Sequence, residues 1–410
     1  MENGDSDGRM ISFEEALARL DSELDGRLVE ARDVPVGEAR GRVLAEAPLS
    51  RLDLPPFDKS AMDGYAVMDG DERDSYRVLE KVAAGQCPTR PLEPGTATKI
   101  MTGAPVPAGA GRVVMVEDTD GGDRAVRVFR HGGRSNICPR GEDLRTGQEV
   151  LPAGTVLDPL AVANLIACGI GTVHVRRRVR VAIVVTGDEL VSSADELAAL
   201  PEETRAGKII DSNGPMLAGL CEAGGLEVVS RCRAPDAPDR LAAAIAEAVG
   251  RADIVVLTGG VSAGDFDYVP AALAAAGLRI VFDRVAIKPG KPLTLAAGPA
   301  CVALGLPGNP VSVFLSFHLF VLRAASLLAG AGPGDRHATV ALAREFAQRR
   351  ADRSSFVPCR LNDVGRAEPV DYHGSAHLLG LTGADGFIRI PVGAARLPAG
   401  ESVAYYPVTL

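Results

Sequence analysis

The segment Val179-Arg-Val-Ala-Ile-Val-Val-Thr-Gly-Asp-Glu-Leu190 sets the architecture of this chain. Its first seven residues form a nearly continuous apolar run rich in β-branched side chains, which is typical of a strand buried on both faces of a parallel sheet. Two carboxylates, Asp188 and Glu189, follow directly after it. The segment therefore predicts a buried strand whose carboxyl end carries acidic groups.

Outward from this segment, strand-like and helix-like stretches alternate as far as residue 330. The expected strands are 208–210, 226–229, 254–257, 280–285 and 293–296, and the expected helices are 215–223, 239–249, 268–276 and 310–328. Such a βαβ rhythm predicts a mostly parallel sheet with helices on both faces. Ligands of sheets of this kind bind beyond the carboxyl ends of the strands.

Two further helices are predicted in the N-terminal half of the chain. Ser12-Phe-Glu-Glu15 is a capping-box pattern that begins an amphipathic helix over 12–25. Asp158-Pro159 has the pattern of an N-cap followed by the first helical residue, and Gly169 is expected to end that helix. The expected fold class is α/β plus β in four parts. These are a discontinuous N-terminal, dimerisation domain (10–50 and 144–177), an inserted β-rich domain (51–143), the α/β domain (178–330) and a small C-terminal β domain (331–410).

Composition excludes several classes of protein. A chain of 410 residues is too long for one ordinary core. The net charge of −9 argues against a nucleic-acid surface, which requires a basic field. Seven cysteines without a CxxC pair favour reduced thiols in the cytoplasm and disfavour zinc. The apolar stretch 311–322 is too short to span a bilayer, so no membrane association is expected.

Two strand ends carry candidate ligand-binding groups. Asp188 and Glu189 could hold Mg²⁺, although acidic residues in the first turn of a helix would explain them equally well. After the strand 254–257 comes Thr-Gly-Gly-Val-Ser-Ala-Gly-Asp-Phe-Asp (258–267), whose glycines would let backbone N–H groups approach a phosphate. The alternative is a tight strand-to-helix turn. We favour the phosphate site, with Asp267 as a second metal contact or positioning group.

The segment Ala286-Ile-Lys-Pro-Gly-Lys-Pro292 brings Lys288 and Lys291 close together on a stiff backbone. Crowded ammonium groups are unfavourable without an anion between them, so a compact oxyanion is expected there. The alternative is two solvated surface lysines. Downstream, Gly305-Leu-Pro-Gly-Asn-Pro310 places Asn309 at a predicted helix N-cap, a weaker anion-attracting position.

The β-rich region contains three polar loops, at 55–66, 100–105 and 140–143, each of which alone could be an ordinary turn. Seven motifs taken together, however, form a recognisable ordered set. They are FDKSAMDGYA, IMTGAPVP, RGED, TGDEL, TGGVSAGDFDY, IKPGKP and GLPGNPVS. In this order and at these separations they resemble the molybdopterin molybdenumtransferase family, the MoeA family, which includes the C-terminal domain of gephyrin. The resemblance covers residues 11–410.

The resemblance implies an enzyme that inserts molybdate into adenylated molybdopterin and releases AMP with Mg²⁺. It implies a homodimer whose active site is shared between subunits, and contact with the upstream adenylyltransferase. Lys288 and Lys291 would seat molybdate, with Ser375 nearby, and Asp188, Glu189 and Asp267 would hold Mg²⁺. The adenylate or pterin phosphate would lie against two loops and the helix start after them, at Thr258, Gly259, Gly260, Ser262, Gly264, Pro307, Gly308 and Asn309.

Asp58, Thr102 and Asp143 match family active-site positions that would complete the cleft from the neighbouring subunit. One position departs from the family pattern, which places an arginine two residues after an aromatic in the last domain. Here Pro358 occupies that position, so Arg360 would have to replace the arginine. Two other functions compete with the transferase: a CinA-like nucleotide hydrolase with a similar central domain, and a non-catalytic dimeric scaffold. The FDKSAMDGYA motif disfavours the first, and the retained lysines and acidic motifs disfavour the second.

Overall fold

The computed structural model describes residues 9–260, 268–334 and 337–408. The chain forms two compact units: unit 1 comprises Met1–Arg32 and Arg176–Leu410, and unit 2 comprises Asp33–Val175. The boundary after Arg32 falls inside the segment 10–50, which we had assigned to one domain. The finer division into four parts stays a prediction.

Unit 1 is built on a six-stranded sheet. In spatial order its strands are β13 (Glu227–Ala234), β10 (Arg180–Thr186), β14 (Ile254–Thr258), β18 (Val302–Leu306), β17 (Pro292–Ala297) and β15 (Arg279–Arg284). The first four strands run parallel, and β17 and β15 are each antiparallel to the strand before them. The prediction of a mostly parallel sheet is confirmed, but β18 was not predicted.

Helices cover both faces of this sheet, as the strand pattern predicts. Val181 and Ile183 of β10 face one apolar cluster, while Ala182 and Val184 face another, because successive side chains of a strand alternate. The first face is covered by α5 (Asn213–Ala223) and α8 (Pro310–Ser316), and the second by α6 (Pro238–Val249) and α7 (Val269–Ala275). Short elements after β10 are β11 (Leu190–Val191), α3 (Ala194–Ala199), α4 (Glu202–Arg205) and β12 (Ile209–Ile210).

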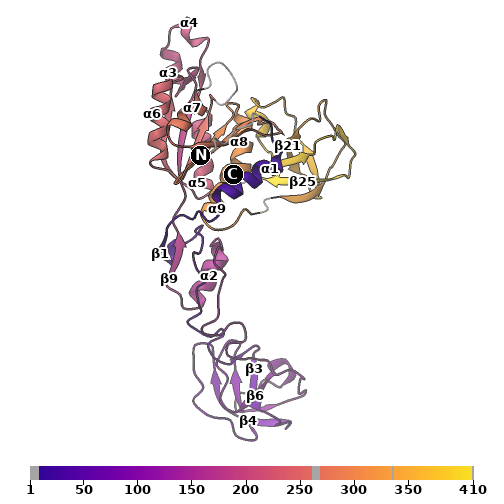
Figure 1. Ribbon diagram of the computed structural model, residues 1–410. Helices are drawn as coiled ribbons and strands as arrows, with labels where there is room; N and C mark the ends of the chain where they lie inside the picture. The colour runs from indigo at the N-terminus through magenta and orange to yellow at the C-terminus, as the bar shows by residue number, and fades with distance from the viewer. Residues whose placement is uncertain (1–8, 261–267, 335–336, 409–410) are drawn as a thin grey trace. The chain divides into compact units, whose positions relative to one another are not determined.

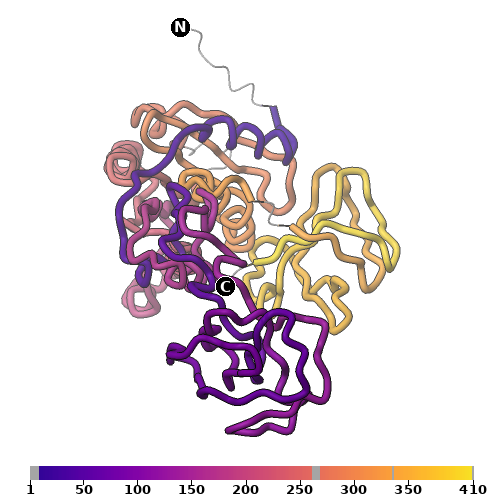
Figure 2. Tube along the Cα trace, turned by 90° about the horizontal axis from the view of Figure 1, so that it is seen from below, coloured from indigo at the N-terminus to yellow at the C-terminus, as the bar shows by residue number. Residues whose placement is uncertain are grey.

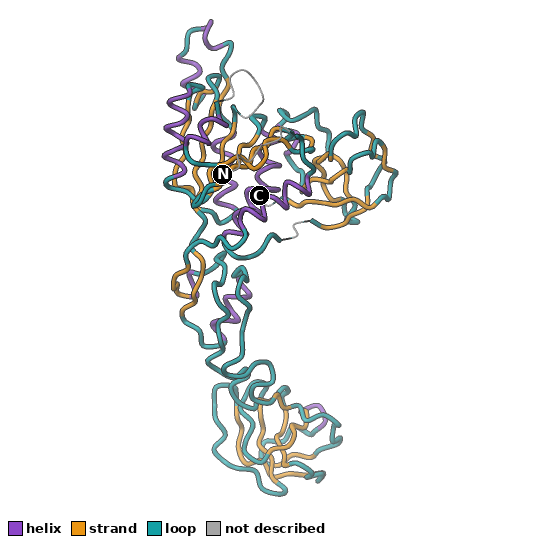
Figure 3. Tube along the Cα trace, viewed as in Figure 1, coloured by secondary structure: helices purple, strands orange, loops and turns teal. Residues whose placement is uncertain are grey.

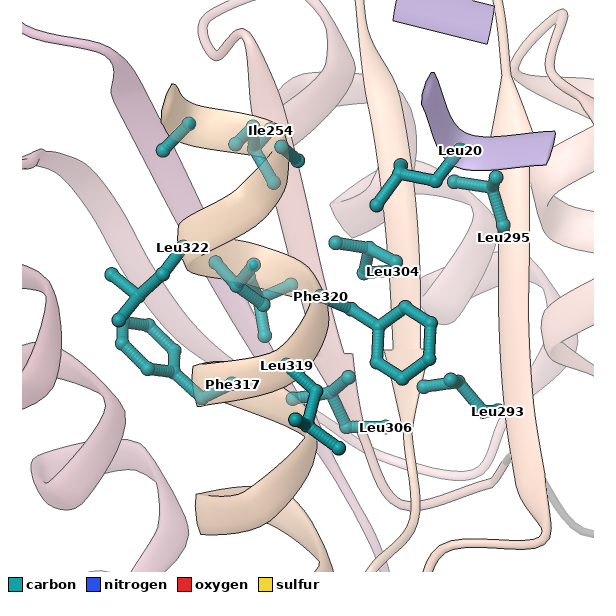
Figure 4. Close-up of a cluster of buried hydrophobic side chains, with 14 of the residues drawn as sticks. Leu20, Ile254, Leu293, Leu295, Leu304, Leu306, Phe317, Leu319, Phe320 and Leu322 are labelled. Atoms are coloured by element: carbon teal, nitrogen blue, oxygen red, sulfur yellow. The ribbon is translucent and has the colours of Figure 1, made fainter. Parts of the chain in front are cut away.

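The predicted helix over 310–328 is continuous but not uniform. It consists of α8, a π-helical turn η3 (Phe317–Val321) and α9 (Leu322–Leu328). Phe320 and Leu319 pack against leucines of the neighbouring strands (Figure 4). The helix is long and apolar enough to cross a membrane, but 78% of its most apolar window is buried inside the protein, as in a core helix.

The N-terminal helix α1 (Phe13–Leu24) belongs to unit 1, where it lies beside the C-terminal strands (Figure 1). Ser12 Oγ accepts a hydrogen bond from Glu15 N at 3.1 Å, which confirms the predicted cap. The Glu15 carboxylate does not complete the capping box, because it pairs with Arg19 at 2.6 Å. Phe13 packs edge-on against Phe356, with ring centroids 5.2 Å apart. The helix is therefore anchored to the C-terminal part of the chain.

The last part of unit 1 is a second sheet, which gathers into one lobe (yellow in Figure 2). Its strands are β16 (Ile287–Lys288), β21 (Ser354–Leu361), β23 (Gly386–Ile390), β25 (Ser402–Pro407) and β19 (Ala338–Ala341), with β22 (Ala367–Pro369) beside β21. Smaller elements are the pair β20 (Phe346–Ala347) and β24 (Arg396–Leu397) and the turn η4 (Leu378–Leu381). Because β16 carries Lys288, the lysine segment is hydrogen-bonded into the C-terminal sheet.

Unit 2 contains the predicted β-rich region, in which strands are joined by long loops (Figure 3). Its main sheet has the order β6 (Ala110–Met115), β3 (Gly64–Met68), β5 (Thr96–Ile100), β4 (Ser75–Val82) and β7 (Ala125–Arg127). Other elements are the pairs β1 (Ala31–Pro35) with β9 (Thr172–Arg176) and β2 (Lys59–Ser60) with β8 (Ile137–Cys138), and the turns η1 (Val36–Glu38) and η2 (Val116–Asp118).

Unit 2 also contains the helix α2 (Pro159–Ala167). Asp158 Oδ1 accepts a hydrogen bond from Ala161 N at 2.7 Å, and Gly169 follows the helix with a φ of 75°. Both ends of this helix are therefore as predicted.

Candidate active site

The Thr186–Leu190 turn separates the two predicted carboxylates. Asp188 faces Asp236: its backbone N donates to Asp236 Oδ2 at 3.2 Å, and its Oδ1 accepts from Asp236 N at 3.1 Å. Thr186 Oγ1 also donates to Asp236. These bonds tie the end of β10 to the residues that follow β13, so Asp188 stabilises the turn. The sequence analysis missed Asp236, because the predicted strand 226–229 ends seven residues before it, whereas β13 extends to Ala234.

Glu189 points elsewhere and lines a cleft of about 1290 Å³ together with the two predicted lysines. It also borders a smaller adjoining pocket of about 80 Å³. Its backbone O accepts a hydrogen bond from Ile209 N at 2.8 Å, which holds the turn against β12. Of the two carboxylates after β10, that of Glu189 is therefore the one available to a ligand.

The end of β14 is tied tightly to its neighbours. Thr258 Oγ1 donates to Pro307 O at 3.1 Å and accepts from Asn213 Nδ2 at 3.3 Å. Asn213 Nδ2 also donates to Gly308 O at 2.7 Å. Gly259 follows with a φ of 90°, and a Cβ atom added there would lie 2.0 Å from the Thr186 carbonyl oxygen. This close approach of two strand ends explains why glycine is needed after Thr258.

The structure describes only the first residues of the predicted phosphate loop. Gly259 and Gly260 line the large cleft, and Thr258 lines the smaller pocket. Ser262, Gly264 and Asp267 lie outside the described residues. Their predicted roles in phosphate and Mg²⁺ binding stay predictions.

The start of α8 receives a residue from the C-terminal part of the chain. Asn309 occupies the predicted N-cap position, but its side chain does not cap the helix. Instead, Asn309 Nδ2 donates to Ser375 Oγ at 2.8 Å, and Val311 N donates to Ser375 O at 3.0 Å. The predicted residues Pro307, Gly308, Asn309 and Ser375 are thereby brought to the same wall of the cleft.

Lys288 and Lys291 are both exposed, and both line the cleft. Within the described residues neither ammonium group forms an ion pair, although carboxylates occur along the same cleft. The backbone between them packs against the interior, because Pro289 and Gly290 are buried. Two positive charges held near each other without a counter-ion among the described residues favour an anionic ligand.

The C-terminal lobe adds two further cations to the cleft, Arg344 and Arg353. Arg353 lines the cleft, and its Nη1 donates to Ile287 O at 3.4 Å, which places it beside the lysine segment. Arg360 does not line it. It lies three residues beyond the cleft-lining Val357 on β21, about 10 Å along the strand, opposite Glu368. Arg353 is therefore the arginine that lies beside the lysine segment, and the predicted role of Arg360 stays a prediction.

An aromatic residue that the sequence analysis did not single out also faces this cleft. Tyr372 is half-buried, and its burial raises the pKa of the phenol to about 12. A phenol in such surroundings is uncharged at neutral pH and offers an apolar ring with one polar atom. The cleft therefore combines cationic, glycine-rich and aromatic walls.

In unit 2 the three polar loops come together. Ser60 N donates to Ala104 O at 3.0 Å, and Arg140 N donates to the Asp58 carboxylate at 2.7 Å. Thr102 N and Oγ1 both donate to Asp63 Oδ1 at 2.7 Å, and these bonds lower the pKa of Asp63. Asp143 N donates to Leu54 O at 2.9 Å.

Asp58, Thr102 and Asp143 are all exposed on these loops. The three motifs that could each have been a separate turn thus form one polar surface. Their predicted roles in a site shared between subunits are untested by this geometry.

No three His, Cys, Asp or Glu side chains in the described ranges gather as a metal site would require. The smaller pocket is nevertheless lined by oxygen-bearing groups, among them Glu189, Asp211 and Thr258. Mg²⁺ is commonly held by one or two carboxylates together with water and substrate phosphates. The side chains present therefore fit a partly hydrated Mg²⁺ near Glu189, and Asp188 is engaged elsewhere.

Known proteins resemble this chain along nearly its whole length. Residues 11–169 match the MoeA N-terminal region (domain I and II), residues 182–326 a probable molybdopterin binding domain, and residues 339–408 the MoeA C-terminal region (domain IV). A molybdopterin molybdenumtransferase of Nostoc sp. is 35% identical over 404 residues, covering 94% of this chain and 90% of the relative. One from Staphylococcus aureus strain Mu50 is 32% identical, covering 96% and 94%.

Solved structures give the same result. A molybdopterin biosynthesis moeA protein from Pyrococcus horikoshii OT3 has a TM-score of 0.83 at 30% identity, covering 98% of this chain and 100% of that protein. A second structure of a moeA protein from this organism has a TM-score of 0.76 at 29% identity. Three consecutive regional matches and full-length relatives at this identity show that the chain belongs to the MoeA family of enzymes.

Proposed function

We propose that this enzyme inserts molybdate into adenylated molybdopterin, with Mg²⁺-dependent release of AMP. The observation that carries the proposal is the pair of ammonium groups, Lys288 and Lys291, which have no ion-pair partner among the described residues and lie in a cleft that also has glycine-rich strand ends. The relatives named molybdopterin molybdenumtransferase support the substrate class. A compact dianion and a phosphate ester are the two ligands that such a cleft would accommodate together.

Molybdate would be bound by the two lysines and by Arg353, which lies beside the same segment. Hydrogen bonds from charged donors to an oxyanion are stronger than bonds between neutral groups, and an arginine fork adds orientation. Ser375, held by Asn309 at 2.8 Å, would supply a neutral hydroxyl from the opposite wall. These groups would hold the dianion ready for transfer to the dithiolene of the pterin.

The adenylated substrate would place its phosphates against Gly259, Gly260 and Gly308. At glycines, ligand atoms can approach the backbone closely. Lys288 would also neutralise negative charge as the phosphoanhydride bond breaks and AMP leaves. The chain's contribution to this step would be orientation and charge neutralisation.

Glu189 would hold Mg²⁺ beside these phosphates, with Asp211 in the same pocket. When bound, Mg²⁺ supplies charge neutralisation at the phosphate oxygens. Glu189 is suited to this because it borders both the cationic cleft and the small pocket that Asp211 also lines.

The direct test is AMP release from adenylated molybdopterin by the purified chain with Mg²⁺, with and without molybdate. We expect release that depends on molybdate and leaves molybdenum in the pterin product. AMP release at the same rate without molybdate would indicate a nucleotide hydrolase and overturn the proposal. A folded protein that releases no AMP would indicate a scaffold.

We further propose that the enzyme is a cytoplasmic homodimer, and that Asp58, Thr102 and Asp143 act in the site of the partner subunit. All three are exposed on one polar surface of unit 2, and all seven cysteines of the chain are free thiols. Co-expression of an Asp58→Asn chain with a Lys288→Ala chain tests the sharing. Mixed dimers should regain up to about half of the activity per dimer, since one of two sites is then intact. Inactive mixed dimers would refute a shared site.

A further inference from the structure

Ser316 is a fully buried residue whose hydroxyl has no partner. Its relative exposure is 0%, and its Oγ makes no hydrogen bond with any described residue. In the described part of unit 1, only one other buried side-chain oxygen or nitrogen, Asn213 Oδ1, lacks a partner. Buried polar groups in proteins are nearly always paired, because an unpaired one loses its bonds to water without replacement. The hydroxyl therefore requires an explanation.

The position of Ser316 relates it to the lysine segment. It is the last residue of α8, and Ser312, one helical turn earlier, lines the cleft. A Cβ atom built on Gly290 would lie 3.4 Å from Ser316 Oγ. Gly290 lies between Pro289 and Lys291 and lines the cleft itself, with a φ of 108°. The hydroxyl therefore lies directly behind the backbone that carries the two ammonium groups.

Packing does not explain the choice of serine. Alanine has a higher helix propensity and would remove the unpaired hydroxyl without leaving a large cavity. The π-helical turn that begins at the next residue is also a less stable local conformation, of a kind frequent at functional sites. Two locally unfavourable features thus coincide behind the lysine segment.

We propose that Ser316 is a positioning residue for the oxyanion seat. When a tetrahedral oxyanion draws Lys288 and Lys291 together, the Pro289–Gly290 backbone adjusts, and Ser316 Oγ donates a hydrogen bond to a carbonyl oxygen of that backbone. The bond supports the loop only in the oxyanion-bound arrangement. This inference rests on the proposed function, because it assumes that the lysines bind the oxyanion.

The test compares molybdate binding and thermal stability of the full-length chain. We expect Ser316→Ala to melt at the same or a higher temperature than the wild type, and to bind molybdate about five- to tenfold more weakly, the effect of one hydrogen bond. In turnover assays the KM for molybdate should rise while kcat at saturation stays close to that of the wild type. A purely structural role would lower the melting temperature instead.

Thr98 provides a matched control. It is also fully buried, its Oγ1 also has no partner, and it lies in β5 of unit 2. Thr98→Val should raise the melting temperature without changing the affinity for molybdate. Ser316→Cys, which keeps the shape but donates only weakly, should bind molybdate with an affinity between those of the wild type and Ser316→Ala.

Molybdate affinity of the wild-type value in Ser316→Ala overturns this inference and leaves the lysine seat intact. Absence of binding in the wild type, with molybdate and with tungstate, overturns the seat as well. The two failures are therefore distinguishable in a single titration series.

Discussion

Substitution of Gly259 by alanine tests whether the glycine after β14 is required by the backbone or only tolerated. The residue has a φ of 90°, and an added Cβ would lie 2.0 Å from the carbonyl oxygen of Thr186 and 3.0 Å from its carbonyl carbon. The left-handed conformation alone costs an L-residue about 1–2 kcal/mol. Relief of the clash must move backbone, since the opposing atoms are not the end of a flexible side chain, and overpacking of this kind costs about 1–3 kcal/mol.

We therefore expect Gly259→Ala to lower the free energy of unfolding by about 2–5 kcal/mol, measured by urea denaturation. The chain supplies a matched control in Gly219, an exposed glycine inside α5 with no atom within 4 Å of its added Cβ. Gly219→Ala should raise stability by about 0.5–1 kcal/mol. If Gly259→Ala were within about 0.5 kcal/mol of the wild type, below the cost of the left-handed conformation alone, the close approach of the two strand ends would be wrong.

Four further outcomes are expected. Lys288→Ala should keep the fold and weaken molybdate binding, measured by calorimetry, about ten- to a hundredfold, because one charged donor is lost; unchanged affinity would remove Lys288 from the seat. Glu189→Gln should lose Mg²⁺-dependent AMP release while a fluorescence titration still detects binding of adenylated pterin; a wild-type rate contradicts the metal assignment. Arg353→Ala should weaken molybdate binding more than Arg360→Ala, and the reverse order would restore the arginine expected from sequence. Hydrogen bonds from Thr146 and Arg140 lower the pKa of Asp53 from 3.8 to about 2. Because this folded-state pKa is depressed, the stabilisation should be complete above pH 3.8 and be lost as the pH falls towards 2, and Thr146→Val should raise the pKa in a carboxyl ¹³C NMR titration; an unchanged titration would contradict the role of Thr146.

The strand ends and their motifs could be predicted from the sequence because local pattern and topology determine them together. A buried apolar run followed by Thr-Gly predicts a parallel strand and a polar turn, and parallel strands place such turns at one edge of the sheet. Glu189, Gly259 and Gly308 accordingly meet at one cleft. The strand β18 was missed, because its apolar run is short and merges with the glycine- and proline-rich turn after it.

Contacts between distant segments could not be predicted in the same way. Asn309 bonds to Ser375 across 66 positions in the sequence, and Asp236 bonds to Thr186 across 50. Neither pair has a periodic signal, because each depends on how separate elements pack. Arg353 also could not be placed in the cleft from the sequence. Arg353 reaches the lysine segment because it directly precedes β21, whose first residue pairs with Ile287, and spacing relative to one aromatic residue did not reveal this.

The candidate site concentrates features that weaken a fold locally. Gly259 and Gly290 adopt conformations that other residues avoid, and both line the cleft. Two buried side-chain oxygens in the described part of unit 1 lack hydrogen-bond partners. Asn213 Oδ1 belongs to a residue at the strand ends, and Ser316 Oγ lies behind the lysine segment. The ammonium groups of Lys288 and Lys291 lie nearby and form no ion pair in the part of the chain that the structure describes. Each of these features occurs singly in many proteins. Strained backbone and unpaired polar groups, however, concentrate at functional sites, where a bound ligand offsets their cost. An anion between the lysines and hydrogen-bond partners for the two unpaired oxygens would relieve these defects together, so the cleft is better explained as a binding site than as a fault in packing.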